Sequence, residues 1–427
     1  MEISVGMSRK WDAYKAGREV AKDVINKLKT PPNFFVLFST IHYEKNGGFK
    51  ELIKGVYDVI PVSTPLIGGT VTGFMNNYGC FSYGTTALAV SSTNMDIAVG
   101  YGKNTKRNPK KAARNCSNMI LKKLKDSKYK NKFLLNLISS SEMPNIPIIG
   151  RKKIIKTGGI SSKIFISMFR ISEYFFQKGY GRDDEVIEEV IKNLPDYNML
   201  SGGTIDDGAA LNNYQFFNNN VLTNSIVSLG IKTDYNLNVK TTHNMKKTDA
   251  ILNITKTSKD GHIIHKIDNK PAVKEFTKTL NWPEDFLNEE NWFRTNYYFP
   301  LGFNTNSKDH EFGPRLLGVI LGDSFVTPIR SKDNYSPILT TSGRRILDAI
   351  DLNLQTYPSK PAFGLISSCA TRFETMGNKI YQAKNKVEKY FDDNPFIVFY
   401  VGGESTYSPE VGLNYMNFSF NSALFWS

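Results

Sequence analysis

Hydrophobic residues follow two different periods along this chain, and each period predicts a different kind of element. In residues 9–29, RKWDAYKAGREVAKDVINKLK, apolar side chains recur at helical spacing, which predicts an amphipathic helix. The TPPN that follows ends this helix because proline cannot continue it. The run FFVLFST at residues 34–40 is almost entirely apolar, so we expect a strand that is buried on both faces.

The same order of elements recurs three times. The first copy contains a strand at 34–40, a helical segment at 48–60, PLIGGTVTG at 65–73 and strands at 80–92 and 95–102. The second contains a strand at 132–141, a helical segment at 183–194, SGGTIDDG at 201–208 and strands at 213–219 and 222–231. The third contains a strand at 362–369, a helical segment at 378–391, VGGEST at 401–406 and a closing strand at 413–426. Each copy reads strand, helix, strand, Gly-Gly and an antiparallel meander, which predicts internal duplication.

Two segments interrupt this order. Residues 142–182 are inserted in the second copy between its first strand and its helix. After the second copy, residues 250–283 predict two strands around an Asp260-Gly261 turn and a helix opened by DNKPA, and residues 316–330 predict a hairpin. We therefore expect an α/β (α+β) protein with mixed, largely antiparallel sheets flanked by helices, in two domains at residues 1–235 and 236–427.

Composition is that of a folded protein in a reducing compartment. The 427 residues are 40% hydrophobic and 22% charged, which excludes wholesale disorder. The three cysteines, Cys80, Cys116 and Cys369, contain no CxxC pair, so neither a disulfide framework nor a zinc site is expected. No leader-like apolar segment and no apolar run of spanning length occurs. We therefore expect a cytoplasmic protein without a membrane partner.

The net charge of +14 is concentrated in one segment, because residues 103–132 hold twelve Lys or Arg against one acidic residue. This segment could be a phosphate-binding patch, but it contains a single aromatic residue for stacking, Tyr129. We favour the solvated face of a helix with six residues turned inward, so nucleic acid is not the expected partner. The inward residues are Ala112, Ala113, Cys116, Met119, Ile120 and Leu124.

The three Gly-Gly stretches are candidate ligand sites. Glycine after a buried strand permits positive φ, so that successive N–H groups and the next side chain can contact one anion or carboxylate. The alternative is that each stretch only closes a turn or allows close packing. The residues concerned are Gly68, Gly69 and Thr70, Gly202 and Gly203 with Thr204, and Gly402, Gly403 and Glu404. Of the adjacent Asp206 and Asp207, one is expected to cap a turn.

The segment SSCATRF, residues 367–373, contains the most specific group of side chains. Cys369 ends a buried strand three residues before Arg372 and near the start of a helix, which predicts a lowered thiol pKa. The alternative is a small apolar residue at a strand end. The spacing of His262 and His265 does not suit a metal pair on a strand, so no metal site is expected. His243 or His310 could serve as a single axial ligand to haem.

Together these residues resemble the FIST family, the F-box and intracellular signal transduction proteins. Residues 7–28 with FFVLFST and PLIGGTVTG resemble the opening of the FIST N-terminal domain, and LSGGTIDDG with YQFFNNNVLTNSIVSLGI resembles its second Gly-Gly block. HIIHKIDNKPAVKEF resembles the junction between the FIST domains. PLGF, SSCATRFETMG and YVGGESTYSPEVGLNYMNFSFNSALFW resemble the C-terminal domain. Gly69 stands where the family normally has cysteine, and Asn269 stands where it has glycine.

The resemblance implies a cytoplasmic sensory module that binds a small polar, amino-acid-like ligand and passes its signal to a separate partner protein. The Cys-x-x-Arg and Gly-Gly-Glu signatures of the family fall on Cys369, Arg372 and residues 402–404. Arg372 is the expected carboxylate clamp, because a planar guanidinium suits that group. Some similar proteins bind haem, so a haem-binding gas sensor is one alternative. A thiol-reactive protein or enzyme centred on Cys369 is the other, although a sensory role is preferred to a catalytic one.

Overall fold

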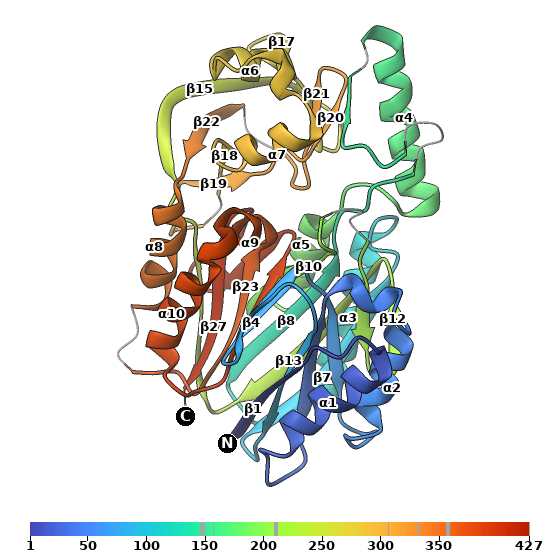
Figure 1. Cartoon of the computed structure of the whole chain (residues 1–427), viewed down its shortest axis with the longest axis vertical. Coiled ribbons are helices and arrows are strands. Elements are labelled where there is room, and N and C mark those ends of the chain that lie inside the picture. The colour runs from blue at the N-terminus through green and yellow to red at the C-terminus, as the bar shows by residue number, and fades with distance from the viewer. Residues whose placement is uncertain are drawn as a thin grey trace.

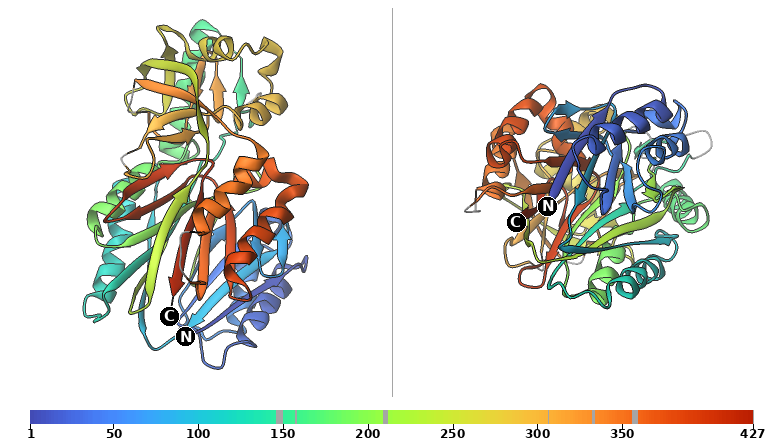
Figure 2. Two further views of the ribbon diagram at one scale, coloured as in Figure 1. Left: turned by 90° about the vertical axis from the view of Figure 1, so that its left-hand side faces the viewer. Right: turned by 90° about the horizontal axis from the view of Figure 1, so that it is seen from below.

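The computed structural model describes residues 1–145, 150–156, 158–208, 212–305, 307–331, 334–355 and 359–426. Three six-stranded sheets form the lower part of the molecule in Figure 1, and a fourth sheet lies above them. The two chain ends lie side by side at the bottom of this view. Seen from below, helices surround the three lower sheets (Figure 2).

The first sheet contains one parallel strand pair, formed by β2 and β3. Its strands, in spatial order, are β1 (Glu2–Ser8), β6 (Thr85–Ser91), β2 (Phe34–Ser39), β3 (Leu66–Thr70), β11 (Gln215–Phe217) and β12 (Asn220–Leu222). The remaining pairings are antiparallel. Helices α1 (Ala13–Ile25) and α2 (Phe49–Tyr57) cover its outer face.

The second and third sheets repeat this order of strand directions. The second runs β7 (Met95–Lys103), β13 (Ser225–Thr233), β8 (Asn131–Ser139), β10 (Asn198–Thr204), β25 (Glu404–Ser408) and β26 (Gly412–Met416), with β8 and β10 parallel. The third runs β14 (Asn236–Thr242), β27 (Phe420–Trp426), β23 (Phe363–Cys369), β24 (Phe396–Val401), β4 (Gly73–Asn76) and β5 (Gly79–Phe81), with β23 and β24 parallel. The recurring order agrees with the three sequence copies, while their origin by duplication stays a prediction.

Helices also cover the outer faces of these two sheets. Helices α3 (Pro109–Leu124) and α5 (Asp183–Asn193) pack on the second sheet. Helices α8 (Gly343–Leu354), α9 (Ala370–Met376) and α10 (Ile380–Phe391) pack on the third. The inner faces of all three sheets share one core, to which β2 contributes Phe34 and Val36. Since Phe35 and Leu37 pack under the helices, β2 is buried on both faces, as its continuous apolar run predicts.

The fourth sheet contains nine strands. They are β19 (Phe312–Arg315), β18 (Leu301–Asn304), β22 (Tyr335–Thr340), β15 (Lys246–Thr257), β16 (Ile263–Ile267), β21 (Ser324–Val326), β20 (Val319–Leu321) and β9 (Ile154–Ile155), with β17 (Lys270–Pro271) paired to β16. Helices α6 (Ala272–Thr279) and α7 (Glu289–Asn296) cover it, and α4 (Gly159–Phe176) stands at its side (Figure 1). Short 3-10 helices occur at Ile41–Glu44, Glu284–Phe286 and Gly377–Lys379. The Asp260-Gly261 turn and the hairpin at 316–330 are confirmed.

The predicted meander after each Gly-Gly stretch is wrong in one respect. The hairpin of β4 and β5 joins the third sheet, that of β11 and β12 joins the first, and that of β25 and β26 joins the second. Each sheet therefore receives a hairpin from another copy, and the three copies are interlocked. The third sheet contains strands from both sides of residue 235, while the two-domain division itself stays a prediction.

Three smaller expectations also need correction. The closing strand at 413–426 is two strands, because Phe418 has a φ of 59° and the chain turns there. Strand β1 was not predicted, although it pairs with β6 along its whole length. The basic face of helix α3 is exposed to solvent and the expected apolar side is buried, except that Met119 is exposed.

Within the described residues, no helix is long and apolar enough to cross a membrane.

Candidate functional site

A cavity of about 490 Å³ lies where the carboxyl ends of the parallel strands meet the fourth sheet and α4. Ser140 and Ile205 follow β8 and β10, and Thr72 follows β3. Cys369 ends β23, and Val401 ends β24. Since the ends of all three parallel pairs point to this cavity, it occupies the position where α/β folds commonly place a ligand.

One wall of the cavity is apolar. Its side chains come from α4, from the fourth sheet and from the loops beside them, and include Met143, Phe169, Leu316, Val319 and Val326. Tyr180 also contributes, and its ring stacks on that of Phe169 with 5.4 Å between centroids. This wall suits the hydrocarbon part of a ligand.

Polar and ionisable groups also line the cavity, including Ser140, Thr371, Lys153 and Asp207. Lys153 Nζ donates to the carbonyl of Gly208 at 2.6 Å. Tyr297 donates its hydroxyl proton to Glu374 Oε2 at 2.8 Å. Burial raises the pKa of Glu374 above its ordinary value, an effect that the Tyr297 hydrogen bond opposes. Groups of both signs therefore face one small cavity.

The structure brings Cys369, Gly402 and Gly403 to the cavity wall. Gly403 has a φ of 82°, and among the six glycines of the three Gly-Gly pairs it alone has a positive φ. Cys369 lies at the end of β23, where Thr371 donates a hydrogen bond to its sulfur at 3.0 Å. All of the predicted site residues that line the cavity therefore belong to the third copy.

The other predicted glycines do not line the cavity, because other atoms of the protein occupy the space beside them. A Cβ on Gly68 would lie 1.8 Å from the carbonyl oxygen of Leu37. Gly69 is similarly closed off by Tyr214, and Gly202 packs against side chains of β24. A Cβ on Gly203 would lie 1.8 Å from the carbonyl oxygen of Gly402. Gly68 and Gly69 thus allow β3 to approach its neighbours in the first sheet, and Gly202 and Gly203 allow β10 to approach the end of β24.

Backbone hydrogen bonds connect the three Gly-Gly stretches with one another. Gly203 N donates to Gly403 O at 2.9 Å, and Gly402 N donates to Gly203 O at 2.9 Å. Thr70 is buried, and its carbonyl accepts from Ile205 N at 3.1 Å. The Gly-Gly stretches therefore join the three copies at one end of the molecule. Asp206 closes a turn by accepting from Gly208 N and Asn212 N, so its expected turn-capping role is confirmed.

Arg372 and Glu404 lie outside the cavity lining. Arg372 lines a separate space of about 10 Å³ and donates to the carbonyl of Ile346 at 2.5 Å. Its Nε and Nη1 have no hydrogen-bond partner among the described residues. Burial lowers the pKa of Arg372 to about 10. Glu404 is fully buried and accepts from Ser419 Oγ at 3.2 Å. The expected carboxylate clamp is thus placed behind the wall rather than in it.

The surroundings of Cys369 contradict the expected fall in its pKa. Burial raises the pKa of the thiol well above its ordinary value, and the nearby carboxyl group of Glu404 raises it further. The hydrogen bond from Thr371 opposes these effects without cancelling them. Cys369 is therefore held as a neutral thiol, which weakens the alternative of a thiol-reactive protein.

We expect iodoacetamide at pH 7.5 to alkylate Cys80 at least about tenfold faster than Cys369, because Cys369 is 3% exposed and Cys80 is only partly buried. Mass spectrometry of digested protein at several labelling times measures both rates. In urea-unfolded protein the three cysteines should react alike. Faster labelling of Cys369 than of Cys80 in the folded protein would restore the thiol-reactive alternative.

The histidines proposed for haem lie away from the cavity. The rings of His243 and His310 are 4.8 Å apart, and the backbone N–H of Met245 donates to His243 Nδ1 at 3.0 Å. Burial, with His310 nearby, lowers the pKa of His243 to about 3. No histidine is among the described residues that line the cavity. The haem alternative therefore gains no axial histidine at this site.

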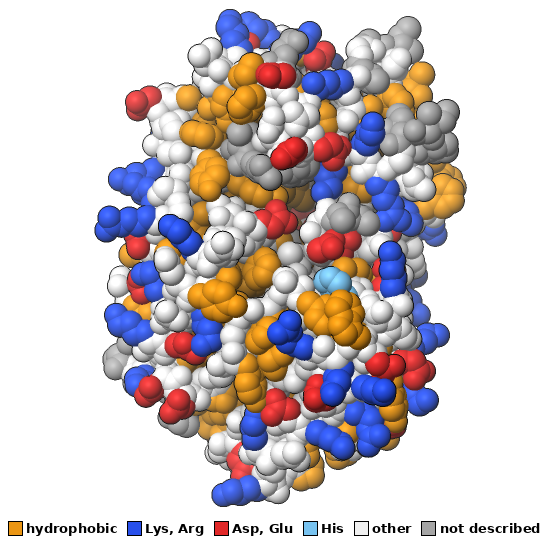
Figure 3. All heavy atoms as spheres, viewed as in Figure 1, with side chains coloured by type: hydrophobic (Ala, Val, Ile, Leu, Met, Phe, Trp, Pro, Cys, Tyr) orange, Lys and Arg blue, Asp and Glu red, His pale blue; other side chains and the backbone are white. Residues whose placement is uncertain are grey.

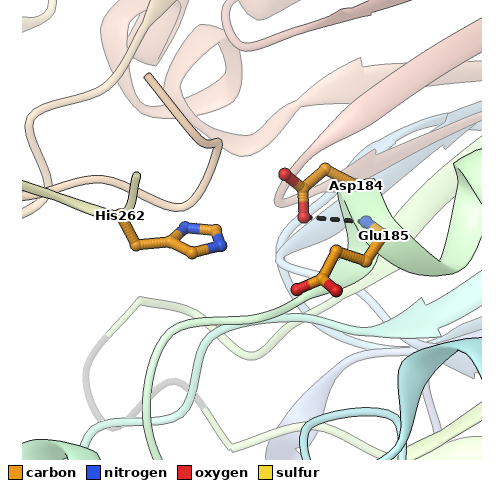
Figure 4. A group of neighbouring side chains, drawn as sticks. All are labelled: Asp184, Glu185 and His262. Carbon is orange, nitrogen blue, oxygen red and sulfur yellow. Dashed lines mark hydrogen bonds between the residues drawn. The ribbon is translucent and has the colours of Figure 1, made fainter. Parts of the chain in front are cut away.

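A third group, Asp184, Glu185 and His262, has ligand atoms within 4.8 Å of one another. Figure 4 shows the imidazole of His262 facing the two acidic residues at the start of α5. Both carboxylates already accept from arginines, Asp184 from Arg330 Nε at 2.6 Å and Glu185 from Arg182 at 2.6 and 2.9 Å. These guanidinium groups supply the positive charge that a cation would bring, so the group does not favour a metal ion. His265, three residues after His262, contacts Ser324 Oγ at 3.0 Å instead.

Sequence reasoning missed several residues of the cavity. Lys153, Phe169 and Tyr180 all belong to the inserted segment 142–182. Tyr297 comes from the region between the second and third copies, and Glu374 from α9. The insertion was the available signal, because a segment added to one copy alone can serve a purpose that the other copies lack.

Comparison with protein families matches the FIST N domain over residues 33–270. Among curated proteins, no sequence matches this chain. Among solved structures, a cyanuric acid hydrolase from A. caulinodans is similar at 10% identity and a TM-score of 0.25, over 54% of this chain and 71% of that one. A similarity of that size bears on neither fold nor activity. The family match covers more than half of the 427 residues, and the protein belongs to the FIST family.

Proposed function

We propose that this protein is a sensor that binds a small amino-acid-like ligand in the 490 Å³ cavity. The observation that carries the proposal is that one cavity is lined both by apolar side chains and by ionisable groups of both signs. A free amino acid combines the same features, with an ammonium and a carboxylate at one end and a side chain at the other. Membership of the FIST family, whose name denotes signal transduction, supports a sensory rather than a metabolic role.

The polar groups suggest how such a ligand would lie. Lys153 would attract the ligand carboxylate, whereas Asp207 and Glu374 would attract its ammonium group. The ligand side chain would then rest on the wall formed by Phe169 and its neighbours. In this arrangement Lys153 takes the place of Arg372 as the carboxylate clamp, because Arg372 lies outside the cavity lining.

Cys369, Gly402 and Gly403 would contact the ligand from the third copy. We assign Arg372 and Glu404 a supporting role behind Cys369, since both are buried there. The remaining predicted residues, Gly68, Gly69, Thr70, Gly202 and Gly203, would position the strands that carry the wall. We further propose that residues 236–427 form the FIST C-terminal domain, that the protein acts in the cytoplasm, and that its signal passes to a separate partner protein.

The proposal is tested by thermal unfolding of the protein with each natural amino acid and a panel of small carboxylates. A ligand at about 100 times its dissociation constant stabilises the folded state by roughly 2.7 kcal/mol, which should raise Tm by several degrees. Lys153→Met should abolish the shift produced by a carboxylate ligand. Lys152→Met is the matched control, because Lys152 is exposed and does not line the cavity.

Two results would contradict the proposal. The first is the absence of any shift in wild-type protein across the amino acids. The second is a shift of equal size in Lys153→Met, in Asp207→Asn and in wild type, which would place the ligand elsewhere.

A further inference from the structure

Helix α4 presents an apolar stripe to the outside of the protein. Ile164, Met168, Ile171 and Phe175 are 53%, 38%, 54% and 62% exposed. Their spacing of four, three and four residues places them on one face of the helix. Tyr174 and Phe176 extend the exposed apolar surface at the end of α4. We call these six residues the α4 stripe.

The α4 stripe is not needed to hold α4 in place. The opposite face of the helix buries Phe169, which packs with Tyr180 and with residues of the fourth sheet. Glu173, one turn later, is also buried. Since the inward face already supplies the packing, the outward apolar residues serve no folding purpose that the described part of the chain shows. Contiguous exposed apolar surface of this kind marks an interaction site.

Exposed basic residues lie at both ends of the α4 stripe. At its carboxyl end, Arg107 Nε donates to Tyr174 O at 2.9 Å and Arg107 Nη2 donates to Phe175 O at 2.8 Å. These bonds attach the helix to the basic segment 103–132, in which Lys103, Lys110 and Lys111 are exposed. At its amino end, the exposed residues include Lys152, Lys156 and Lys163.

Two acidic residues near the α4 stripe, Asp260 and Glu142, are paired with bases. Asp260 accepts from Arg170, and Glu142 lies 3.2 Å from Lys178 Nζ. Figure 3 shows hydrophobic side chains at the right-hand edge, at the level of α4, with Lys and Arg side chains beside and below them. The surface around the stripe is therefore apolar in its middle and positive at its rim.

We propose that the α4 stripe docks the protein peripherally on an anionic lipid surface. Ile, Met, Phe and Tyr side chains would enter the boundary between headgroups and acyl chains, while the lysines at both ends would contact acidic headgroups. This contact needs no spanning segment, and so it is compatible with the absence of a spanning helix among the described residues. It goes beyond ligand sensing and does not depend on it.

Charge favours an anionic lipid surface over two other partners for the α4 stripe, a second copy of the chain and nucleic acid. A second copy of the chain would bring one positive rim against another, which disfavours pairing through the α4 stripe. Nucleic acid would satisfy the lysines but would leave the exposed isoleucines and Phe175 without an apolar partner. An anionic bilayer offers both an apolar interior for the exposed hydrophobic side chains and negative charge for the lysines.

The test is sedimentation of the full chain with two kinds of vesicle, phosphatidylcholine alone and phosphatidylcholine with roughly one third phosphatidylglycerol. We expect at least about tenfold stronger partition onto the anionic vesicles, falling as salt is raised. Ile171→Ser combined with Phe175→Ser should reduce binding at least about tenfold. Lys110→Glu combined with Lys111→Glu should also reduce it. Circular dichroism checks that each variant is folded.

Matched controls use exposed residues away from α4. Tyr381→Ser, on α10, removes an apolar side chain that is 59% exposed, and Lys45→Glu with Lys50→Glu reverses two exposed charges near α2. Both should bind like wild type. Failure of wild type to bind the anionic vesicles, or binding unchanged by Ile171→Ser with Phe175→Ser, overturns the proposal. A dimer in light scattering that this double variant dissolves would identify a second copy instead. Salt-sensitive retention on DNA or RNA without vesicle binding would identify nucleic acid.

Discussion

Gly203→Ala is expected to lower the free energy of unfolding by about 3 kcal/mol, near the upper end of the usual cost of overpacking. The added Cβ would lie 1.8 Å from the carbonyl oxygen of Gly402 and 2.9 Å from Ser140 Cβ. A backbone carbonyl cannot rotate away as a side chain can, so β10 and the start of β25 would have to separate. That movement would also strain the two hydrogen bonds between the Gly203 and Gly402–Gly403 stretches. Urea denaturation followed by circular dichroism measures the loss.

Gly343→Ala is the matched control for this substitution. A Cβ on Gly343 would meet no atom within 4 Å, and Gly343 begins helix α8. Alanine costs less backbone entropy in a helix than glycine, so this variant should be as stable as wild type or slightly more stable. If Gly203→Ala unfolded at the same urea concentration as wild type, the close approach of the two Gly-Gly stretches would be wrong.

Pattern in the sequence was enough to locate the first strand of each parallel pair. The runs at 34–40, 132–141 and 362–369 are apolar almost throughout, and the corresponding strands β2, β8 and β23 are buried on both faces. A strand with helices outside and a shared core inside has no solvent face, so it needs no polar alternation. Helical spacing likewise located α1, α2, α3, α5 and α10.

The exchange of hairpins between copies could not be predicted from the same pattern. A period of two residues shows which face of a strand is buried, but it does not identify the neighbouring strand. β11 pairs with β3, although Gln215 and its partner Gly69 are far apart in the sequence. β24 pairs with β4 across an even longer separation, with Phe399 opposite Phe74. Adjacent strands in sequence are the default expectation, and here each hairpin leaves its own copy.

For the candidate site, the sequence identified residues of the third copy and missed those of the inserted segment 142–182. Cys369, Gly402 and Gly403 follow strands directly, and strand ends can be located from an apolar run. Arg372 lies only three residues further, but its position in helix α9 turns it toward α8 and Phe420 instead of the cavity. Lys153 and Phe169 reach the cavity from an insertion whose course depends on contacts with the fourth sheet. Such contacts leave no motif in the chain.

Wild-type protein is expected to lose stability as the pH rises from about 5 to 8, and Glu404→Gln should remove part of that loss. Burial raises the pKa of Glu404 to about 8. Over this pH range the folded state therefore keeps a proton on Glu404 that the unfolded chain releases. Unfolding then becomes easier by about 1.4 kcal/mol for each pH unit attributable to this group. The effect is complete near pH 8, above which both states are ionised.

The stability difference between variant and wild type isolates this group, because burial also raises the pKa of Asp183 to about 7 and that of Glu173 to about 8 in both proteins. Urea unfolding at pH 5, 6, 7 and 8 should show Glu404→Gln gaining on wild type as pH rises. Glu410→Gln, at an exposed turn, is the matched control and should follow wild type at every pH. A difference between Glu404→Gln and wild type that stays constant across this range would mean that Glu404 is ionised in the folded protein. Arg372, which lies nearby and whose Nε and Nη1 have no hydrogen-bond partner among the described residues, would then be the group that stabilises its charge.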